Sequence, residues 1–398
     1  MGNRARICAP EYVAPAHDTL TVISRSGDPM SIRSSFCVLA LAPLVLAFDN
    51  GGAAVAQSDW TSGKLELQSA GALALGPDGV LFVADHMGAA IIALKLEDSG
   101  GKKAAEASLS ALDVAGIDEI AAFLMGSSRE SITINDLAVN QASGTAYLSV
   151  TRTAGATIEQ ALIAVNGPEE FEILDLESAQ YQRLTLDNAP DPTTGRRNQR
   201  AESITDMAFF DGRLYVAGLS NEEFASKLRV VNYPFAELEA GTSIEIYHGA
   251  HGAWETRAPV RAMVPFVFDN EPTLLCGYTC TPLVRVPVTA IQGVEKYVGT
   301  TVAELGAGNS VLDMITYDKD GTSYLLIANT RRGMMKLETD GLHEIKGLTE
   351  PVRDTAGQPY ETLEGFEGVI QLDKFSATHA LILVQTDDGV NLKTVLLP

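Results

Sequence analysis

The stretch 72-ALALGPDGVLFVADHMGAAIIALKL-96 consists of three short apolar runs separated by two polar or small-residue breaks. Asp78-Gly79 separates the first two runs, and 85-DHMG-88 separates the second from the third. Short runs rich in Val, Ile, Leu and Phe and bounded by Gly, Asp or Asn predict β-strands, and Asp-Gly is a turn signal. The stretch therefore predicts a unit of three antiparallel strands.

The same pattern returns five more times along the chain. The further copies start near residues 134, 204, 260, 311 and 366, so successive copies lie about 50 to 70 residues apart. A unit of short strands repeated at this period is typical of β-propeller blades. We therefore predict an all-β protein folded as a β-propeller with six blades. Seven blades stay open as an alternative, because the segments 97–133 and 166–203 are long enough to hold a degenerate copy.

The two ends of the repeat array indicate how the ring closes. The last copy, 366–397, ends on its third strand, and 59-DWTSGKLELQSAG-71 supplies a strand before the first copy. Pairing these two strands would remove two exposed sheet edges, which is the physical reason why propellers overlap their ends. We expect the N-terminal strand to pair with the C-terminal blade.

Residues 30–56 have the parts of a secretory signal peptide. Arg33 precedes the apolar run 36–48, which is too short to span a bilayer, and Ala54-Val55-Ala56 offers small residues for cleavage. We predict an exported protein, periplasmic or secreted, in which 57–398 is a single propeller domain and 1–29 is an over-called start or a disordered segment. The alternative is that 30–56 forms a buried N-terminal helix or strand.

The charge of the chain excludes several classes of partner. The formal net charge is −22, and no cluster of basic residues interrupts it. Nucleic acids and anionic membranes would repel such a surface, and no other apolar segment approaches the length of a membrane span. We expect a small molecule or a metal ion as the partner, with a periplasmic protein as the alternative.

The stretch 76-GPDGVLFVAD-85 resembles the strand–turn–strand unit of NHL-repeat and gluconolactonase/regucalcin-type propellers. The resemblance implies six blades and a divalent metal, such as calcium, in the central channel, held by acids and amides at the starts of the innermost strands. The sequence departs from that pattern at 69-SAGALAL-75, which has no carboxylate, and at Arg261, which is a cation. The matching positions in this chain are Asn135, Asp136, Asp206, Asp313 and Glu367.

The aspartates at these positions also have a structural interpretation. They recur in 134-INDLAV-139, 204-ITDMAF-209 and 311-VLDMIT-316. A carboxylate at the start of an innermost strand can accept hydrogen bonds from the backbone of the neighbouring blade, and its repetition favours that role. A metal-binding or substrate-binding role is the alternative.

The segment 246-IYHGAHGAWETRAPVR-261 is dense in functional groups, with two of the six histidines and one of the two tryptophans. In a propeller blade the loop between the second and third strands opens on the same face as the start of the innermost strand, so distant segments meet at one channel mouth. We predict a ligand or metal site there; the alternative is a loop that only covers the blade edges. The predicted ligand-binding residues are Tyr247, His248, His251, Trp254, Glu255, Arg257, Arg261 and Arg331.

The other notable motif is the cysteine pair of 274-LLCGYTC-280, which the strand pattern places at the end of a second strand and just before a third. In an exported protein a disulfide between Cys276 and Cys280 would fit such a tight turn. A soft-metal site, with copper as the first candidate, is the second interpretation, because C-x-x-x-C with nearby imidazoles suits that metal and resembles the ligand loop of Sco-type copper proteins. A redox-active or nucleophilic cysteine is the third. The candidate metal ligands are Cys276, Cys280, His86, His251, Asp136, Asp206, Asp313 and Glu367.

Three functions follow from these patterns. The first is an exported propeller that binds a small ligand or a metal ion, copper with a redox role in particular, at the channel mouth. The second is a calcium-dependent hydrolase of lactones or esters that uses the strand-start carboxylates. The third is a platform for protein interactions without catalysis.

Overall fold

The computed structural model describes residues 60–97, 112–192, 198–235, 238 and 240–398. The predicted signal peptide (30–56) and the segment 1–29 lie outside the described residues. All described residues belong to one compact unit, Ala54–Pro398. Within them, no helix combines the length and the apolar character that crossing a bilayer requires.

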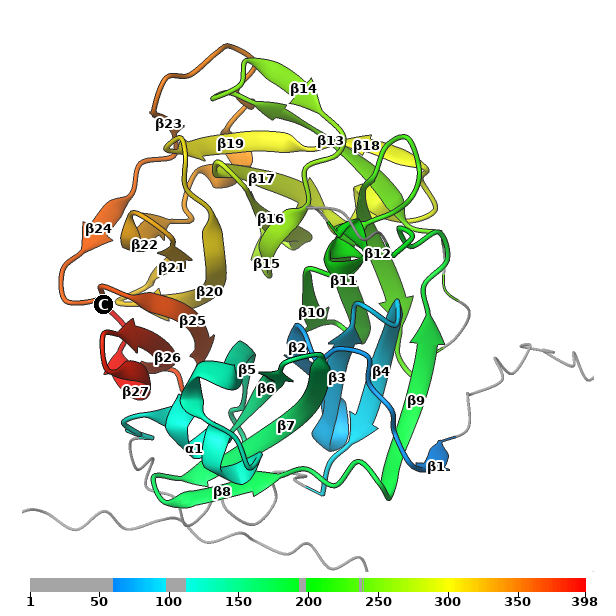
Figure 1. Cartoon of the computed structure of the whole chain (residues 1–398). Helices are drawn as coiled ribbons and strands as arrows, with labels where there is room; N and C mark the ends of the chain where they lie inside the picture. Colours follow the sequence, from blue (N-terminus) through cyan, green and yellow to red (C-terminus); the bar gives the residue numbers. More distant parts are fainter. Residues whose placement is uncertain (1–59, 98–111, 193–197, 236–237, 239) are drawn as a thin grey trace, which may run out of the picture. The chain divides into compact units, whose positions relative to one another are not determined.

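Six small sheets form the described part of the chain, and their innermost strands contact one another in a closed circle (Figure 1). The predicted six-bladed propeller is therefore confirmed. In their described residues, the segments weighed as a seventh blade instead contain helix α1 (Ile117–Leu124) and the strands β8 (Glu170–Ile173) and β9 (Ala179–Thr185), which belong to the sheets of other blades.

The blades are numbered here by the order in which their innermost strands occur. Blade I contains β1 (Thr61–Gly63), β2 (Leu73–Leu75), β3 (Val80–Asp85), β4 (Ala90–Lys95) and β9 (Ala179–Thr185), and blade II contains β5 (Ile132–Asn140), β6 (Thr145–Ala154), β7 (Thr157–Gly167) and β8 (Glu170–Ile173). Blade III contains β10 (Asp206–Phe210), β11 (Arg213–Leu219), β12 (Ser226–Asn232), β13 (Thr242–His248), β14 (Ala253–Glu255) and β18 (Lys296–Val298).

The second half of the chain forms the other three blades. Blade IV contains β15 (Val260–Phe268), β16 (Glu271–Tyr278), β17 (Pro282–Pro287), β19 (Thr300–Leu305) and β23 (Thr355–Gly357). Blade V contains β20 (Val311–Lys319), β21 (Thr322–Asn329), β22 (Gly333–Glu338) and β24 (Glu361–Leu363), and blade VI contains β25 (Val369–Lys374), β26 (His379–Thr386) and β27 (Gly389–Leu396).

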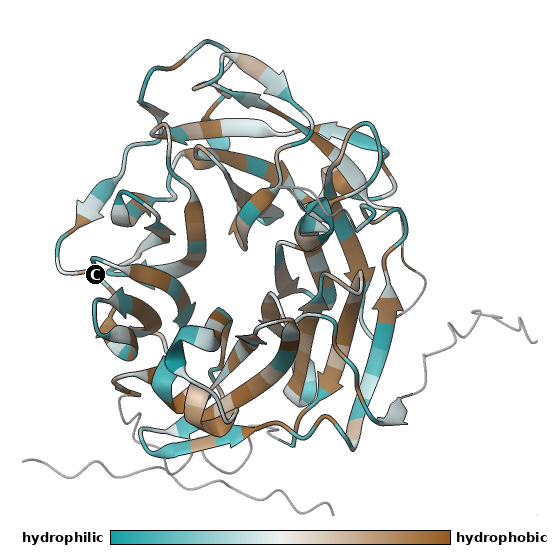
Figure 2. Ribbon diagram, viewed as in Figure 1, coloured by the Kyte–Doolittle hydropathy of each residue, from teal (hydrophilic) through white to brown (hydrophobic). Residues whose placement is uncertain are grey.

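The blades do not follow one another around the ring in chain order. β5 of blade II contacts β2 of blade I and β25 of blade VI, while β2 also contacts β10 of blade III. Blade II is thus inserted between the first and the last blade. Six apolar clusters, each built from two neighbouring blades, fill the interfaces in this same order, and Figure 2 shows the apolar residues concentrated along the strands. Burial of these faces is the main force that holds the blades together.

The predicted closure by the N-terminal strand is wrong. β1 pairs with β9 at the outer edge of blade I, while the free edge of β27 is covered by residues 112–116. Val114 and Leu392 exchange two backbone hydrogen bonds of 2.9 Å. The ring is therefore closed by the two segments that flank blade II in the sequence. Residues 112–116, before it, complete blade VI, and β9, after it, completes blade I. With the edge of β27 already paired, no edge is left there for β1.

Candidate functional site

The histidine-rich segment forms a hairpin at the outer edge of blade III. β13 and β14 pair with Tyr247 opposite Trp254 and His248 opposite Ala253, and residues 249–252 form the turn. Two contacts fix the hairpin to β19 of blade IV: Thr301 Oγ1 donates to the Tyr247 carbonyl at 2.6 Å, and Gly249 N donates to Glu304 Oε1 at 2.5 Å. The hairpin thus lies against two blades, which holds its side chains in place.

Cys280 lies in the turn between β16 and β17 of blade IV. Both Cys280 and Thr281 have left-handed backbone angles, with φ of 60° and 64°. Residues other than glycine keep this conformation only where the surroundings enforce it. Here Cys280 N donates to the Asn309 carbonyl at 2.8 Å, and Thr281 Oγ1 donates to the Gly306 carbonyl at 2.7 Å. The connection into blade V therefore holds the backbone of the turn that carries Cys280.

These two loops bring His248, His251 and Cys280 together. One ligand atom from each lies within 4.8 Å of the other two, and this is the one such His, Cys, Asp or Glu group in the described residues. Atoms that share a four-coordinate ion with bonds of about 2.0 to 2.3 Å lie roughly 3.3 to 3.8 Å apart. A small movement of His251, whose side chain is exposed, would bring the ligand atoms from their present separation to the separation expected around a bound ion.

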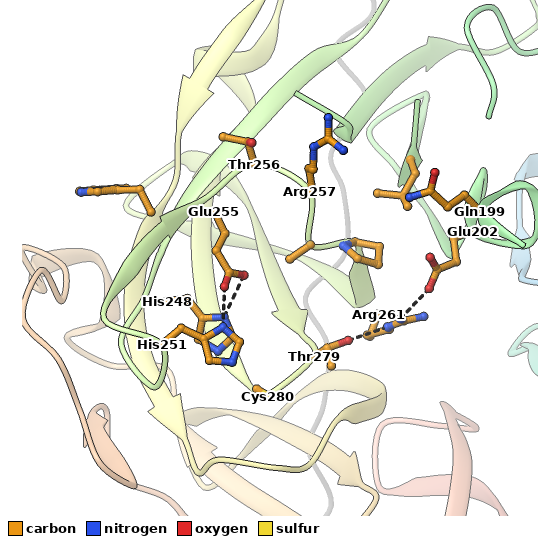
Figure 3. A pocket seen from close by; sticks show the side chains of 14 residues that line it. Gln199, Glu202, His248, His251, Glu255, Thr256, Arg257, Arg261, Thr279 and Cys280 are labelled. Carbon is orange, nitrogen blue, oxygen red and sulfur yellow. Dashed lines mark hydrogen bonds and ion pairs between the residues drawn. The ribbon is translucent and has the colours of Figure 1, made fainter. Parts of the chain in front are cut away.

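Glu255 holds both imidazoles by their Nδ1 atoms. Its two carboxylate oxygens lie 3.0 Å from His248 Nδ1 and 2.5 Å from His251 Nδ1. The two rings stack with centroids 3.9 Å apart, and Figure 3 shows their edges opposite Glu255 directed toward Cys280. A carboxylate on one ring nitrogen fixes the tautomer and leaves the other nitrogen free to bind a metal. The two imidazole contacts also lower the pKa of Glu255 and outweigh the opposing effect of its burial.

The Nε2 atom of His248 is the least satisfied polar atom of this group. The residue is only 2% exposed, and within the described part of the chain its Nε2 has no hydrogen-bond partner. Buried polar atoms are nearly always paired, because leaving one unpaired costs about 1 to 3 kcal/mol. The Nε2 atom of His248, on the ring edge directed toward Cys280, is therefore free to accept a further partner.

The group opens into a cleft of about 580 Å³ between blades III and IV. Trp254 forms part of the wall, 49% exposed and packed edge-on against Tyr247 with ring centroids 5.3 Å apart. The opposite wall contains Arg261, which donates to Thr279 Oγ1 at 2.8 Å and pairs with Glu202 at 2.7 Å. Arg261 also lines the central channel, so this residue borders both the cleft and the channel.

Most of the predicted ligand-binding residues lie around this cleft. Its lining includes His248, His251, Trp254, Glu255, Arg257 and Arg261. Tyr247 is instead buried behind Trp254. Arg331 lies in the turn after β21, where its backbone N donates to Asn329 Oδ1, and does not line the cleft.

The two cysteines have different environments, and the predicted disulfide is wrong. Both are free: Cys276 is fully buried in the apolar cluster between blades III and IV, whereas Cys280 is partly exposed in the cleft. Cys276 lies within β16, opposite Met263 and Val284, so the strand's alternation turns its side chain into the core. Burial raises the pKa of the Cys276 thiol well above its usual range, which disfavours thiolate chemistry there.

His86 is not part of this group either. It packs against Gly71, at whose Cα an added Cβ would lie 2.6 Å from His86 Nδ1. Burial lowers the pKa of His86. Its carbonyl accepts a hydrogen bond from Ser203, so the loop around it joins blades I and III.

The aspartates of the central channel bind backbone atoms. Asp206 accepts from Met263 N at 2.5 Å, Asp313 from Leu372 N at 2.8 Å and Asp136 from Leu73 N at 2.6 Å, each in a neighbouring blade. The second oxygen of Asp206 and of Asp313 accepts from the next residue of its own strand at 2.7 Å. These contacts match the structural interpretation of the repeated aspartates.

Burial is the main cause of the raised pKa values of these carboxyl groups. It raises the pKa of Asp136 to about 7 and those of Asp206 and Asp313 well above the usual range. Repulsion by a neighbouring carboxylate adds to the effect, from Asp373 on Asp136 and from Asp136 on both Asp206 and Asp313. Their side chains retain some contact with the channel interior, although the surrounding blades shield them from bulk water.

Glu367 does not complete a carboxylate site in the channel. It is exposed, and its side chain accepts a hydrogen bond from Gly365 N just before blade VI begins. In the strand register Gln371, which follows the same irregularity as Asp136 and Asp313, takes the equivalent position. The carboxylate of blade VI is Asp373, whose Oδ2 accepts from Val139 N at 2.7 Å.

Some residues of the site were not predicted from the sequence. Glu202 and Gln199 precede β10, and Thr256 and Thr279 border the two loops of the site. Glu304 lies behind the hairpin, 1% exposed, and burial raises its pKa to about 7. No local pattern marks these residues, because each reaches the site through the packing of a different blade.

Comparison with known proteins gives similarity in fold alone. No protein-family model matches the sequence, and no curated protein is significantly similar to it. Solved structures that resemble it include a putative oxidoreductase (glucose dehydrogenase) of Thermus thermophilus, at 15% identity over 84% of this chain and 100% of the other, with a TM-score of 0.35. The soluble aldose sugar dehydrogenase of Escherichia coli is 12% identical over 85% and 99% of the two chains, with a TM-score of 0.33.

The PQQ-bound aldose sugar dehydrogenase of Streptomyces coelicolor is 11% identical over 85% of this chain and 98% of its own, with a TM-score of 0.31. At these values the likeness carries no argument about the chemistry of this chain, and the resemblance to NHL-repeat propellers stays an expectation. The assignment of the fold rests on the chain's own six sheets: it is a six-bladed β-propeller.

Proposed function

We propose that this protein is an exported β-propeller that binds one transition-metal ion through His248, His251 and Cys280 and brings a small ligand to that ion in the adjoining cleft. The observation that carries the proposal is the buried, unpaired Nε2 atom of His248, whose ring Glu255 orients toward Cys280. Carboxylate–histidine–metal arrangements of this kind are the usual way in which proteins orient imidazole ligands.

Copper is the metal that this ligand set favours. One thiolate with two imidazoles is a soft to borderline set, and among divalent first-row metals such sites bind copper most tightly, ahead of zinc. Calcium prefers six to eight oxygen ligands, and two of the candidate carboxylates, Asp206 and Asp313, have both oxygens engaged by backbone N–H groups. The calcium-dependent hydrolase has correspondingly less support.

Metal analysis of two cysteine variants tests the proposal. The purified protein, loaded with copper and passed through a desalting column, should retain about one ion per chain. Cys280→Ser should lose it, because a serine hydroxyl is a poor ligand for this metal. Cys276→Ala is the matched control: it should retain the ion, because that thiol lies in the apolar core.

Two outcomes would contradict the proposal. One is a protein that retains neither copper nor zinc after loading. The other is equal metal loss in Cys276→Ala and Cys280→Ser when both variants are folded by circular dichroism, since this would mean that the ligand set differs from the one proposed.

A further inference from the structure

The charges around the cleft indicate what kind of ligand it takes. Both carboxylates of the lining are engaged, Glu202 by Arg261 and Glu255 by the two imidazoles. Arg257 also lines the cleft, and it makes no ion pair or hydrogen bond within the described residues. Arg257 is exposed, and among the described residues that line the cleft it is the one cation without a carboxylate partner.

A bound metal ion would leave the cleft with a positive charge. The two charges of a divalent ion would be balanced by the Cys280 thiolate and the Glu255 carboxylate, and Arg261 is balanced by Glu202. The guanidinium of Arg257 then remains uncompensated. A site lined by an excess of one charge attracts ligands of the opposite sign, so the ligand should be an anion.

The metal site also has room for a ligand. Three protein ligands leave at least one coordination position of a four-coordinate ion open, as in sites that bind a substrate or water. Figure 3 shows the Arg257 guanidinium directed away from the two imidazoles, with Glu255 between them. A ligand that contacts both the metal ion and the Arg257 guanidinium must therefore carry an acceptor group at each end. The volume of about 580 Å³ is within the usual range for small-molecule sites.

We infer that the cleft binds a small organic dicarboxylate, with one carboxylate on the metal ion held by His248, His251 and Cys280 and the other paired with Arg257. This inference rests on the proposed metal site and adds the class of ligand to it. Arg257 can form a bidentate pair with a carboxylate, which provides both charge and orientation. The exposed face of Trp254 offers an apolar wall for the carbon chain between the two ends.

Calorimetric titration with two dicarboxylates of different length tests the inference. Succinate and glutarate are titrated into copper-loaded protein, and glutaramide serves as the neutral analogue of glutarate. At least one of the two acids should bind, and glutaramide should not. The Kd should rise at least tenfold in Arg257→Gln, and also in Cys280→Ser, which lacks the ion. Arg353→Gln is the matched control, because it removes an exposed arginine that does not line the cleft.

The metal content of each sample is measured before and after the titration. It distinguishes a failure of the proposed metal site from a failure of the inferred dicarboxylate binding. If the protein holds its ion but neither acid binds more tightly than glutaramide, or if Arg257→Gln and Arg353→Gln behave alike, the inference is overturned and the metal site stands. If the wild-type protein holds no ion, the proposed function fails and the inference fails with it. Retained ion with selective loss of binding in Arg257→Gln supports both.

Discussion

The central channel and the cleft between blades III and IV both contain ionisable side chains, but these side chains differ in how completely their polar atoms are hydrogen-bonded. In the channel, both oxygens of Asp206 and of Asp313 accept hydrogen bonds from backbone N–H groups. In the cleft, Glu255 satisfies one nitrogen of each imidazole, and the other nitrogen of His248 stays buried and unpaired among the described residues.

This difference indicates that the carboxylates of the channel have a structural role and that the cleft is a binding site. A polar group with a full set of internal partners already has what folding requires of it, so its burial needs no ligand to explain it. A buried group with an unused lone pair costs free energy in the isolated protein, and such a cost persists where function requires it. Mutations should therefore affect stability in the channel and binding in the cleft.

The largest expected effect concerns Asp313. Asp313→Ala should lower the free energy of unfolding by about 2 to 3 kcal/mol, because it leaves the buried N–H groups of Met314 and Leu372 without partners. Chemical denaturation measures this change. Asp318→Ala, on the same strand but exposed, should change the value by less than about 0.5 kcal/mol. Copper binding should be the same in both variants; a loss confined to Asp313→Ala would contradict the division between the two regions.

A smaller effect is expected for Glu255. Glu255→Gln should weaken copper binding by about tenfold, because the amide can orient the imidazoles less well and carries no negative charge near the ion. The Kd measured by competition with a chromogenic chelator tests this. The free energy of unfolding of the metal-free protein should change little, because Glu255 is partly exposed. An unchanged Kd would show that Glu255 does not position the ligands.

The smallest effect concerns pH. Burial raises the pKa of Asp136 to about 7 and of Asp373 to about 6, whereas an unfolded aspartate titrates near 4. Between these values the folded protein holds protons that the unfolded chain has lost, so the free energy of unfolding should fall as pH rises from about 4 to 7. Thermal unfolding at pH 5 and pH 8 should show this decrease, and Asp373→Asn should reduce it. An identical pH dependence in the variant would rule out Asp373 as a cause.

The repeat and its strands could be predicted from the sequence, because each strand is encoded by local alternation and turn residues. Asp78-Gly79 and Asp320-Gly321 lie at turns that need left-handed backbone, and all four residues have positive φ in the structure. The order of the blades could not be predicted. It depends on which edge the segments 112–116 and 179–185 cover, and that choice is made by long-range pairing rather than by local pattern.

The candidate site, too, could be predicted only as far as local sequence patterns reach. Its histidines and Cys280 stand out by residue type, and the rule that loops of one face converge brought them together as a hypothesis. The different roles of Cys276 and Cys280 depend on one property that spacing does not reveal: β16 ends at Tyr278, so only Cys280 lies in the turn. Likewise Gln371, and not Glu367, is equivalent to Asp136, because β25 begins only at Val369 and Gln371 directly follows the register shift that blades II, V and VI share.

The insertion of blade II between blades I and VI has a further consequence for the chain's ends. Propellers commonly close by pairing the two ends of the chain, which removes two exposed sheet edges. Here the seam is made by two interior segments that flank one blade, and β1 only adds an outermost strand beside β9. Among the described residues the circle of blades is therefore closed by contacts in which β1 takes no part.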